Sequence, residues 1–397
     1  PLGLAEIRRQ VLDADTVLLE YALGERGSQA WVASASGLAV HALPPRDEIE
    51  RAARRLHQAA SAPPAERAAG WSEAAAELSR LVLPPDLAGL SAKRLLVVAP
   101  GALQYVPFAA LPLPGAGAQP VMERFEVVSA PSASVVATLR QEHAGAARAR
   151  KELAVLADPV FEPDDPRVQT ARRHAGAGTQ VAMAGQGESL ARALRSVTGT
   201  GGDRLLTRLP FSRQEAEAIL AGAPRRASLR ALGFDASRDL ATSPALADYR
   251  FVHFATHGLL NTRQPELSGL VLSLVDREGR RRDGFLRLHD IYDLRLNAEL
   301  VVLSGCQTGL GKDMRGEGLQ GLTRGFMYAG APRVVASLWQ VDDLATAELM
   351  KRFYRAMLVE KRPPAAALRA AQRELAASRQ WSAPFYWAAF GLHGDWR

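Results

Sequence analysis

The chain has 397 residues, of which 47% are hydrophobic and 23% are charged, and its formal net charge is +7. This length allows two domains of about 150 to 200 residues, and no run of about 18 apolar residues predicts a membrane-spanning helix. The basic residues are mostly arginines spread through alanine-rich stretches, which argues against a nucleic-acid partner, and no membrane partner is expected.

The chain contains one cysteine, Cys306, which excludes an internal disulfide and a cysteine-rich metal site. A single thiol fits a reducing compartment, so we expect a cytoplasmic protein. The opening stretch from Pro1 to Glu6 lacks the basic start and the apolar core of a secretory signal. It also lacks an initiator methionine, which indicates either a piece of a longer protein or an altered amino terminus.

Apolar runs and helical periodicity divide the first half of the chain into strands and helices. The expected strands are residues 17–21, 29–32 and 95–99, and the expected helices are residues 47–60, 72–83 and 132–142. The Ala/Arg/Gly-rich stretch that ends at Arg150 has the composition of a linker. We therefore expect two domains, residues 1–150 and residues 151–397.

The second half opens with a buried strand at residues 153–156. Residues 162–208 are rich in Gly, Ala and Arg with little periodicity, which indicates a loop or insertion without regular structure. Strands and helices alternate after it, with strands expected at 250–255, 270–275, 299–304 and 333–338 and helices at 213–220, 288–294, 318–329, 342–358 and 365–377. This alternation predicts an α/β fold with a mostly parallel sheet flanked by helices.

Two chemically reactive side chains follow predicted strands of the second half. His257 follows the strand that ends at Ala255, and Cys306 follows the strand that ends at Ser304. Functional residues collect at the carboxyl ends of strands in open α/β sheets, and neighbouring strands lie about 5 Å apart, so the two side chains can meet. A lone Cys or His at such a position is more often a core residue. The pair favours catalysis, because Gly lies beside each residue and the His lies about 50 residues before the Cys.

A neighbouring imidazole activates a thiol and relays its proton to a leaving amine, which is the chemistry of a Cys/His dyad. The transition state of acyl transfer also needs backbone N–H groups aimed at the oxyanion, and the amides of Gly258 and Cys306 are the expected donors. His253 is interpreted as a structural residue, because no third metal ligand accompanies it. We therefore expect no metal. The Gly-rich stretch 309–321 fits neither a dinucleotide-binding nor a phosphate-binding motif, so we also expect no cofactor.

Several short motifs of the second half resemble one family. They are His253–Gly258, Ser268–Leu272, Leu303–Gly309, Gly316–Gly318, Tyr328–Ala331, Ser337–Asp343 and Tyr386–Phe390, with weaker matches at Val98–Pro112 and Pro131–Ser134. The sequence resembles the CHAT family, caspase-like proteases that are often fused to tetratricopeptide repeats and are related to separase. The resemblance implies a caspase-like fold, a Cys/His dyad at Cys306 and His257, and an amino-terminal half that is non-catalytic and pseudo-caspase-like.

The segment after the strand at 333–338 carries the candidate substrate contacts. In separase-like enzymes a similar Leu-Trp segment followed by acids borders the pocket for the residue that precedes the cleaved bond. The resemblance therefore implies substrate-binding roles for Trp339, Asp342 and Asp343, with a carboxylate pairing with a substrate Arg or Lys. An alternative stays open, because Asp342 is also placed to cap the following helix, with Asp343 in its first turn.

Together these observations predict a cysteine endopeptidase that hydrolyses peptide bonds of protein substrates through Cys306 and His257, with basic residues expected before the cut. The expected partners are the protein substrate and a regulatory protein or an upstream repeat domain. The alternative hypothesis is a protease-like interaction scaffold whose dyad is catalytically idle.

Overall fold

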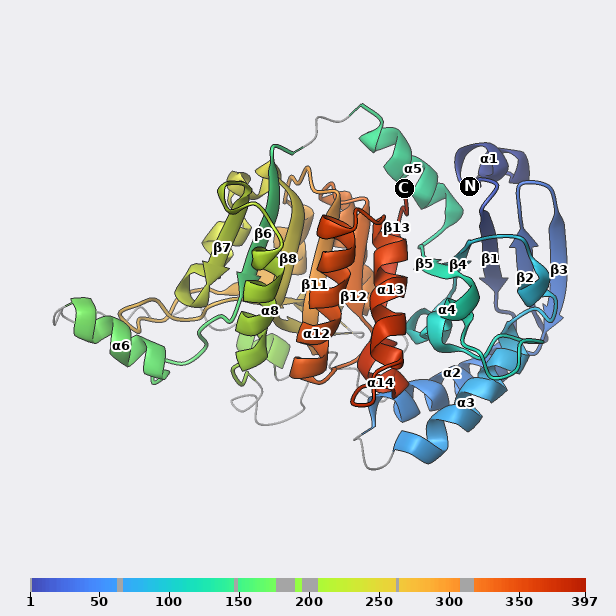
Figure 1. Ribbon diagram of the computed structural model, residues 1–397, viewed down its shortest axis with the longest axis horizontal. Helices are drawn as coiled ribbons and strands as arrows, with labels where there is room; N and C mark the ends of the chain where they lie inside the picture. Colours follow the sequence, from blue (N-terminus) through green and yellow to red (C-terminus); the bar gives the residue numbers. More distant parts are fainter. Residues whose placement is uncertain are drawn as a thin grey trace. The chain divides into compact units, whose positions relative to one another are not determined.

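The computed structural model describes residues 2–62, 67–145, 149–175, 190–194, 206–261, 264–307 and 318–397. The chain forms two compact units (Figure 1). One unit contains Pro1–Ala146 together with Arg352–Arg397, and the other contains Ala147–Lys351. The second boundary lies inside helix α12 (Asp343–Tyr354). Within the described ranges, no helix is both long and apolar enough to cross a membrane.

The first unit is built on a mixed sheet with the strand order β13-β5-β4-β1-β2-β3. Neighbouring strands from β13 to β1 are parallel, whereas β1, β2 and β3 form an antiparallel meander. The strands are β1 (Thr16–Ala22), β2 (Ser28–Ala33), β3 (Leu38–Leu43), β4 (Arg94–Val98), β5 (Glu126–Ser129) and β13 (Phe390–Gly394). The expected strands at 17–21, 29–32 and 95–99 are therefore confirmed.

Helices cover this sheet because their apolar residues recur at helical spacing. In α2, Ile49, Ala52, Ala53 and Leu56 are all buried and form one apolar stripe that joins the core of the unit. The expected helix at residues 132–142 is also present, and the Ser132 hydroxyl accepts a hydrogen bond from a first-turn amide. The helices of this unit are α1 (Leu4–Gln10), α2 (Arg46–Ser61), α3 (Arg67–Val82), α4 (Val121–Arg124), α5 (Ala133–His143), α13 (Pro364–Ala376) and α14 (Pro384–Trp387).

The carboxyl-terminal segment 352–397 packs in the first unit, although the sequence grouped it with the second half. Strand β13 lies parallel to β5, with Leu392 opposite Val128. In addition, Arg369 of α13 donates hydrogen bonds to two backbone carbonyls of α4. These contacts join residues that are more than two hundred positions apart, which explains why local sequence patterns did not indicate them.

The second unit contains a mostly parallel sheet with the order β7-β6-β8-β11-β12, as the alternation of elements predicted. Strand β9 pairs antiparallel with the end of β8, and β10 pairs antiparallel with β9. The strands are β6 (Lys151–Ala157), β7 (Ser228–Leu232), β8 (Tyr249–Leu259), β9 (Gly269–Val271), β10 (Phe285–Arg287), β11 (Leu300–Gln307) and β12 (Arg333–Ser337).

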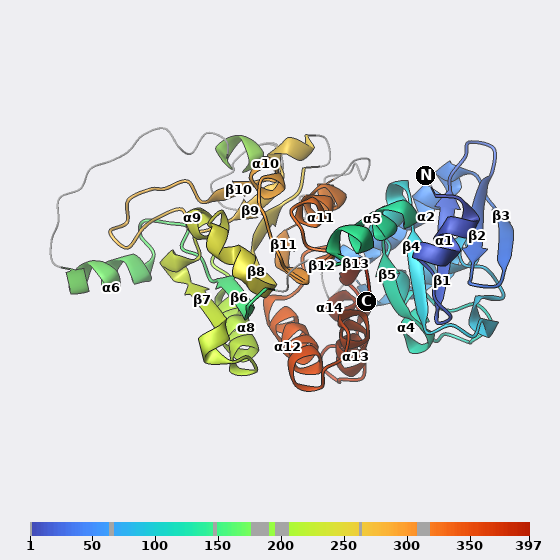
Figure 2. The ribbon, with the colours of Figure 1, turned by 90° about the horizontal axis from the view of Figure 1, so that it is seen from above.

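Helices lie on both faces of this parallel sheet. Figure 2 shows α10 and α11 on one face, and α8 and α12 on the other. Such cover on both sides fits the continuous apolar runs of the central strands, since β11 buries Leu300 through Ser304. The helices of this unit include α6 (Pro166–Ala175), α8 (Pro210–Ala221), α9 (Arg238–Ala241), α10 (Leu288–Tyr292) and α11 (Gly318–Tyr328).

The expectation that residues 162–208 lack regular structure was wrong for residues 166–175, which form α6, and for residues 190–194, which are helical. Pro166 takes the first position of this helix, and the Asp165 carboxylate accepts a hydrogen bond from the Arg167 amide at 2.8 Å. Proline at that position and an aspartate before it are start signals of a helix. The remaining parts of this stretch at 176–189 and 195–205 lie outside the described residues.

Candidate active site

Strands β8 and β11 are parallel neighbours, which confirms the predicted adjacency of the strands that carry His257 and Cys306. Both residues lie inside these strands rather than after them, because the pairing continues past Ala255 and Ser304. Cys306 lies directly opposite Gly258. Paired residues of neighbouring strands are about 5 Å apart, so the Cys306 backbone is next to the residue that follows His257.

A β-bulge interrupts this pairing at the candidate site. Ser304 lies opposite Ala255, but Cys306 lies opposite Gly258, so β8 carries two residues where β11 has only Gly305. Gly305 has a φ angle of +97°, a conformation that favours glycine, and a Cβ atom there would lie 3.0 Å from the carbonyl oxygen of Thr256. Bulges re-aim side chains and recur beside active sites, and His257 is one of the two bulged residues here.

His257 is almost fully buried, with 1% of its surface exposed. Its Nε2 atom lies 2.6 Å from the carbonyl oxygen of Thr207, and its ring centroid lies 5.3 Å from that of Phe161. A carbonyl oxygen can only accept a hydrogen bond, so Nε2 must carry the hydrogen. Burial lowers the pKa of His257, while the bond to Thr207 opposes this shift. The neutral ring therefore has its lone pair on Nδ1.

The side chain of Cys306 lies outside the described residues, so the structure places the backbone of this residue and not its sulfur. What it does provide is the local frame: an extended backbone at the end of a buried strand, next to the bulge that contains His257. The amides of Gly258 and Cys306, which were expected to bind the oxyanion, belong to the same pair of strands.

The segment that contacts His257 is held by Asp158, a residue that the sequence reasoning did not single out. Asp158 follows β6 directly and is fully buried, with 0% of its surface exposed. Its carboxylate accepts hydrogen bonds from Arg208 and Arg213, and it also lies 2.9 Å from the guanidinium of Arg167. The rule that strand ends carry functional residues would have identified Asp158, because the strand before it was predicted.

The three residues assigned to a substrate pocket have structural roles in the folded chain. Asp342 caps α12, since its Oδ1 atom accepts a hydrogen bond from the Ala345 amide at 2.9 Å, which confirms the alternative interpretation of this residue. Asp343 accepts a hydrogen bond from the Phe211 amide at 3.0 Å and thereby caps a second helix, α8. Trp339 is 1% exposed and belongs to the core.

Asp343 should make the stability of the protein depend on pH. Burial raises its pKa from 3.8 to about 6, although the bond from Phe211 acts in the opposite direction. The folded chain therefore retains a proton that the unfolded chain has lost, and the free energy of unfolding falls as pH rises from about 4 to about 6. In Asp343→Asn, we expect the thermal midpoint to fall less over this interval than in the unmodified chain. Equal slopes in both proteins would contradict the assignment.

His253 lies in the core between β8 and α8. Its Nε2 atom is 2.9 Å from Oε1 of Glu215, and neither side chain has more than 1% of its surface exposed. The interpretation of His253 as a structural residue agrees with this position. Among the residues that the structure describes, no three His, Cys, Asp or Glu side chains form a cluster that could hold a metal ion.

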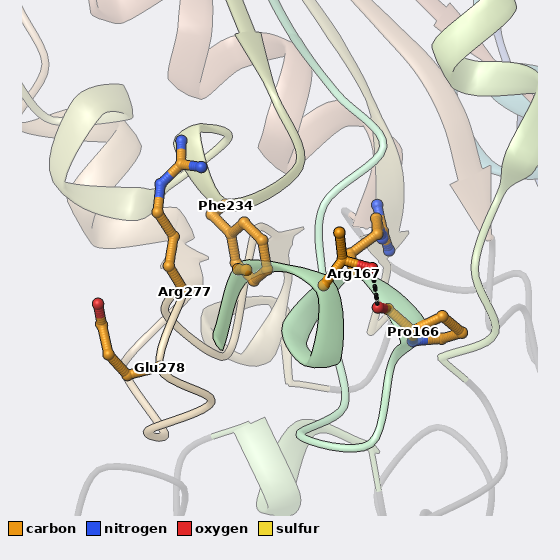
Figure 3. Close-up of a pocket in the computed structure, with 7 residues that line it drawn as sticks. Pro166, Arg167, Phe234, Arg277 and Glu278 are labelled. Carbon is orange, nitrogen blue, oxygen red and sulfur yellow. Dashed lines mark hydrogen bonds between the residues drawn. The ribbon is translucent and has the colours of Figure 1, made fainter. Parts of the chain in front are cut away.

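A pocket of about 590 Å³ lies beside α6, and it shares Arg167 with the ion pairs of Asp158 (Figure 3). Its lining residues are Pro166, Arg167, Thr170, Ala171, Phe234, Arg277 and Glu278. The Arg277 guanidinium lies 5.5 Å from the ring centroid of Phe234, so the two side chains form one wall. No residue of the predicted dyad or substrate pocket lines it.

The sequence matches a known protein family and parts of two known proteins. A family model described as the CHAT domain matches residues 50–395. Tetratricopeptide repeat protein 28 of Mus musculus is 37% identical over 114 residues, which cover 29% of this chain and 5% of that protein. The Homo sapiens protein of the same name is 37% identical over 106 residues, which cover 27% of this chain and 4% of that protein. The matched part is thus a small fraction of these relatives.

Among solved structures, the Saccharomyces cerevisiae separase–securin complex at 2.6 Å resolution is similar in fold. The TM-score is 0.52 at 9% sequence identity, and the match covers 98% of this chain and 31% of the other. Identity this low supports the fold alone. The fold is accordingly caspase-like, with a mixed, mostly parallel sheet flanked by helices.

Proposed function

The chain belongs to the CHAT domain family, and from this membership and the strand geometry we propose that it is a cysteine endopeptidase. Cys306 is the nucleophile and His257 is the general base. The observation that carries the proposal is the β8–β11 pairing, in which the only cysteine of the chain lies opposite Gly258, next to His257. The caspase-like fold supports the same reaction class.

In the proposed mechanism, Nδ1 of His257 takes the thiol proton as the sulfur of Cys306 attacks the carbonyl carbon of the substrate. The amides of Gly258 and Cys306 stabilise the oxyanion. The imidazolium then protonates the leaving amine, and the peptide bond breaks to leave a thioester. His257 next deprotonates a water molecule, which attacks the thioester, releases the carboxylic acid product and restores the thiol. The carbonyl of Thr207 orients the ring throughout, because it holds the hydrogen of Nε2.

We further propose cleavage after basic residues, with Asp343 as the carboxylate that pairs with the substrate cation. A partly buried carboxylate makes a strong charge-assisted bond to Arg or Lys. Because the pKa of Asp343 is about 6, the preference for basic residues should strengthen as pH rises through that value. Asp342 would act by capping α12, the helix whose first residue is Asp343.

The direct test uses an unbiased peptide library together with an electrophilic peptide probe that modifies active-site thiols. Because Cys306 is the only cysteine, a single added probe mass reports this residue without ambiguity. We expect cleavage of a subset of peptides, a basic residue before the cut, and loss of cleavage after one probe is bound. Cleavage that continues at full rate in the fully labelled protein would contradict the proposal. The same library read at pH 5 and pH 7.5 tests the role of Asp343.

The alternative, a scaffold whose dyad is idle, draws support from one observation. An imidazole with 1% of its surface exposed does not reach a substrate unless the surrounding chain moves. The relatives are named tetratricopeptide repeat proteins, so a repeat domain or a regulatory protein is the proposed trigger of such a movement. A chain that neither labels nor cleaves alone, but does both in a longer form with its repeats, would favour regulation. A chain that does neither in both forms would favour the scaffold.

A further inference from the structure

We propose that Asp158 is a positioning residue for His257, because it anchors Arg208 and thereby holds the neighbouring Thr207 carbonyl against the imidazole. This inference rests on the proposed function of His257 as the base. It assigns a role to a fully buried charge that neither the dyad nor the oxyanion donors explain.

The side chains of Asp158 and Arg208 form a bidentate ion pair. Nε of Arg208 donates to one carboxylate oxygen at 2.8 Å, and Nη2 donates to the other at 3.1 Å. Paired bonds of this kind fix direction as well as distance. The Arg208 side chain is 43% exposed, whereas the Asp158 carboxylate is fully buried. The guanidinium therefore reaches inward from the surface to an acceptor that is fixed in the core.

Asp158 holds the same segment through its backbone. Its amide donates to the Ser212 hydroxyl at 3.2 Å, and that hydroxyl donates to the carbonyl of Leu209 at 2.6 Å. Asp158 has a φ angle of +49°, a conformation that costs about 1 kcal/mol or more in a residue with a side chain and persists only where surrounding contacts impose it. The side chain and the backbone of Asp158 therefore both bond to the segment from Arg208 to Ser212.

Two further cations, Arg167 and Arg213, keep the Asp158 carboxylate paired when Arg208 is replaced. A buried carboxylate is costly unless it is paired. Nε of Arg213, in the first turn of α8, bonds to Asp158 at 2.7 Å, and Arg167 lies 2.9 Å from it. Removing Arg208 leaves both of these contacts in place. We expect the protein to fold without Arg208, while the segment that contains Thr207 loses its ion pair with Asp158.

The consequence for His257 follows from covalent geometry. The carbonyl of Thr207 is bonded to the amide nitrogen of Arg208, so a shift of Arg208 moves the oxygen that lies 2.6 Å from Nε2. The segment also runs close to the bulge, since a Cβ atom on Gly305 would lie 3.5 Å from Leu209. Without the carbonyl, the ring has no fixed acceptor for the Nε2 hydrogen, and the tautomer with its lone pair on Nδ1 is no longer selected.

The experiment compares Arg208→Ala and Arg208→Lys with a matched control, Arg230→Ala, whose partner Glu217 lies on the surface. We expect Arg208→Ala to lower kcat by about 10²-fold with KM nearly unchanged, because the reacting groups lose alignment. Arg208→Lys, which keeps the charge without the bidentate pairing, should recover part of this loss. Arg230→Ala should retain full activity.

Nitrogen NMR of histidine-labelled protein provides a readout that does not need catalysis, since the two ring nitrogens have well-separated shifts. His257→Gln identifies the His257 signals among the eight histidines. We expect one tautomer in the unmodified chain and a mixture in Arg208→Ala. An unchanged tautomer in folded Arg208→Ala would overturn the inference. A chain that shows the expected tautomers but never cleaves peptides would instead overturn the proposed function. Asp158→Asn, checked by thermal unfolding, should behave as Arg208→Ala does.

Discussion

Replacing Cys306 with alanine is expected to reduce peptide cleavage to background, and replacing His257 with alanine is expected to lower kcat/KM by about 10²- to 10⁴-fold. Alanine at 306 removes the nucleophile, so no thioester can form. Alanine at 257 leaves a thiol that must ionise without a base. Because the two residues act as a unit, the double variant should be no less active than Cys306→Ala.

The matched control for the histidine is His289→Ala, which removes a side chain that is 68% exposed on the same unit. This variant should cleave the preferred library peptide at the unmodified rate. The rate of thiol alkylation adds a second measurement, since only Cys306 can react. We expect slower alkylation near neutral pH in His257→Ala. Full cleavage by purified Cys306→Ala would rule out the mechanism.

Gly305→Ala is expected to impair both stability and catalysis. At a φ angle of +97° any side chain is strained, and the added Cβ atom would meet the carbonyl oxygen of Thr256 at 3.0 Å. A strained backbone of this kind costs about 1–3 kcal/mol, and we expect the free energy of unfolding to fall by that amount. Relief of the contact would displace the bulge, which sets the position of Cys306 relative to His257. Activity should therefore fall further than the population of folded protein.

Gly321→Ala is the matched control for this glycine change. Gly321 lies in α11, and an added Cβ atom would make an ordinary contact of 3.6 Å with Leu288. Alanine is favoured over glycine by about 1 kcal/mol inside a helix, so the control should be as stable as the unmodified chain or more stable. Denaturant unfolding measures the stability of both variants. If Gly305→Ala matched Gly321→Ala in stability and activity, the bulge would not be a constraint on the site.

The candidate dyad was predictable from the sequence because its signals are local. Apolar runs marked the strands that carry His257 and Cys306, and glycine beside each residue indicated backbone N–H groups open to an oxyanion. The alternation of strands and helices predicted the parallel sheet, and the structure confirms that the two strands are neighbours. The register was not predictable. The shift at Gly305 depends on how two strands pair, and neither strand specifies it alone.

The groups that position His257 were not predicted, because their contacts join distant segments of the chain. Thr207 lies 50 positions before His257, and Arg208 lies 50 positions after Asp158, so each contact exists only once the chain has folded back. The stretch that contains Thr207 and Arg208 has little periodicity, which made it look unstructured. Asp158 was accessible to sequence reasoning, since it lies two residues after the predicted strand 153–156. Its significance depends on the guanidinium groups that meet there.

The sequence by itself determined the family, the α/β class and the two residues proposed for catalysis, because periodicity, composition and short motifs act over a few neighbouring positions. The tertiary structure alone decided the bulge at Gly305, the carbonyl that faces His257, the burial of Asp158 among three arginines and the membership of residues 352–397 in the first unit. Each of these depends on the free energy of contacts between distant segments, which no local pattern encodes.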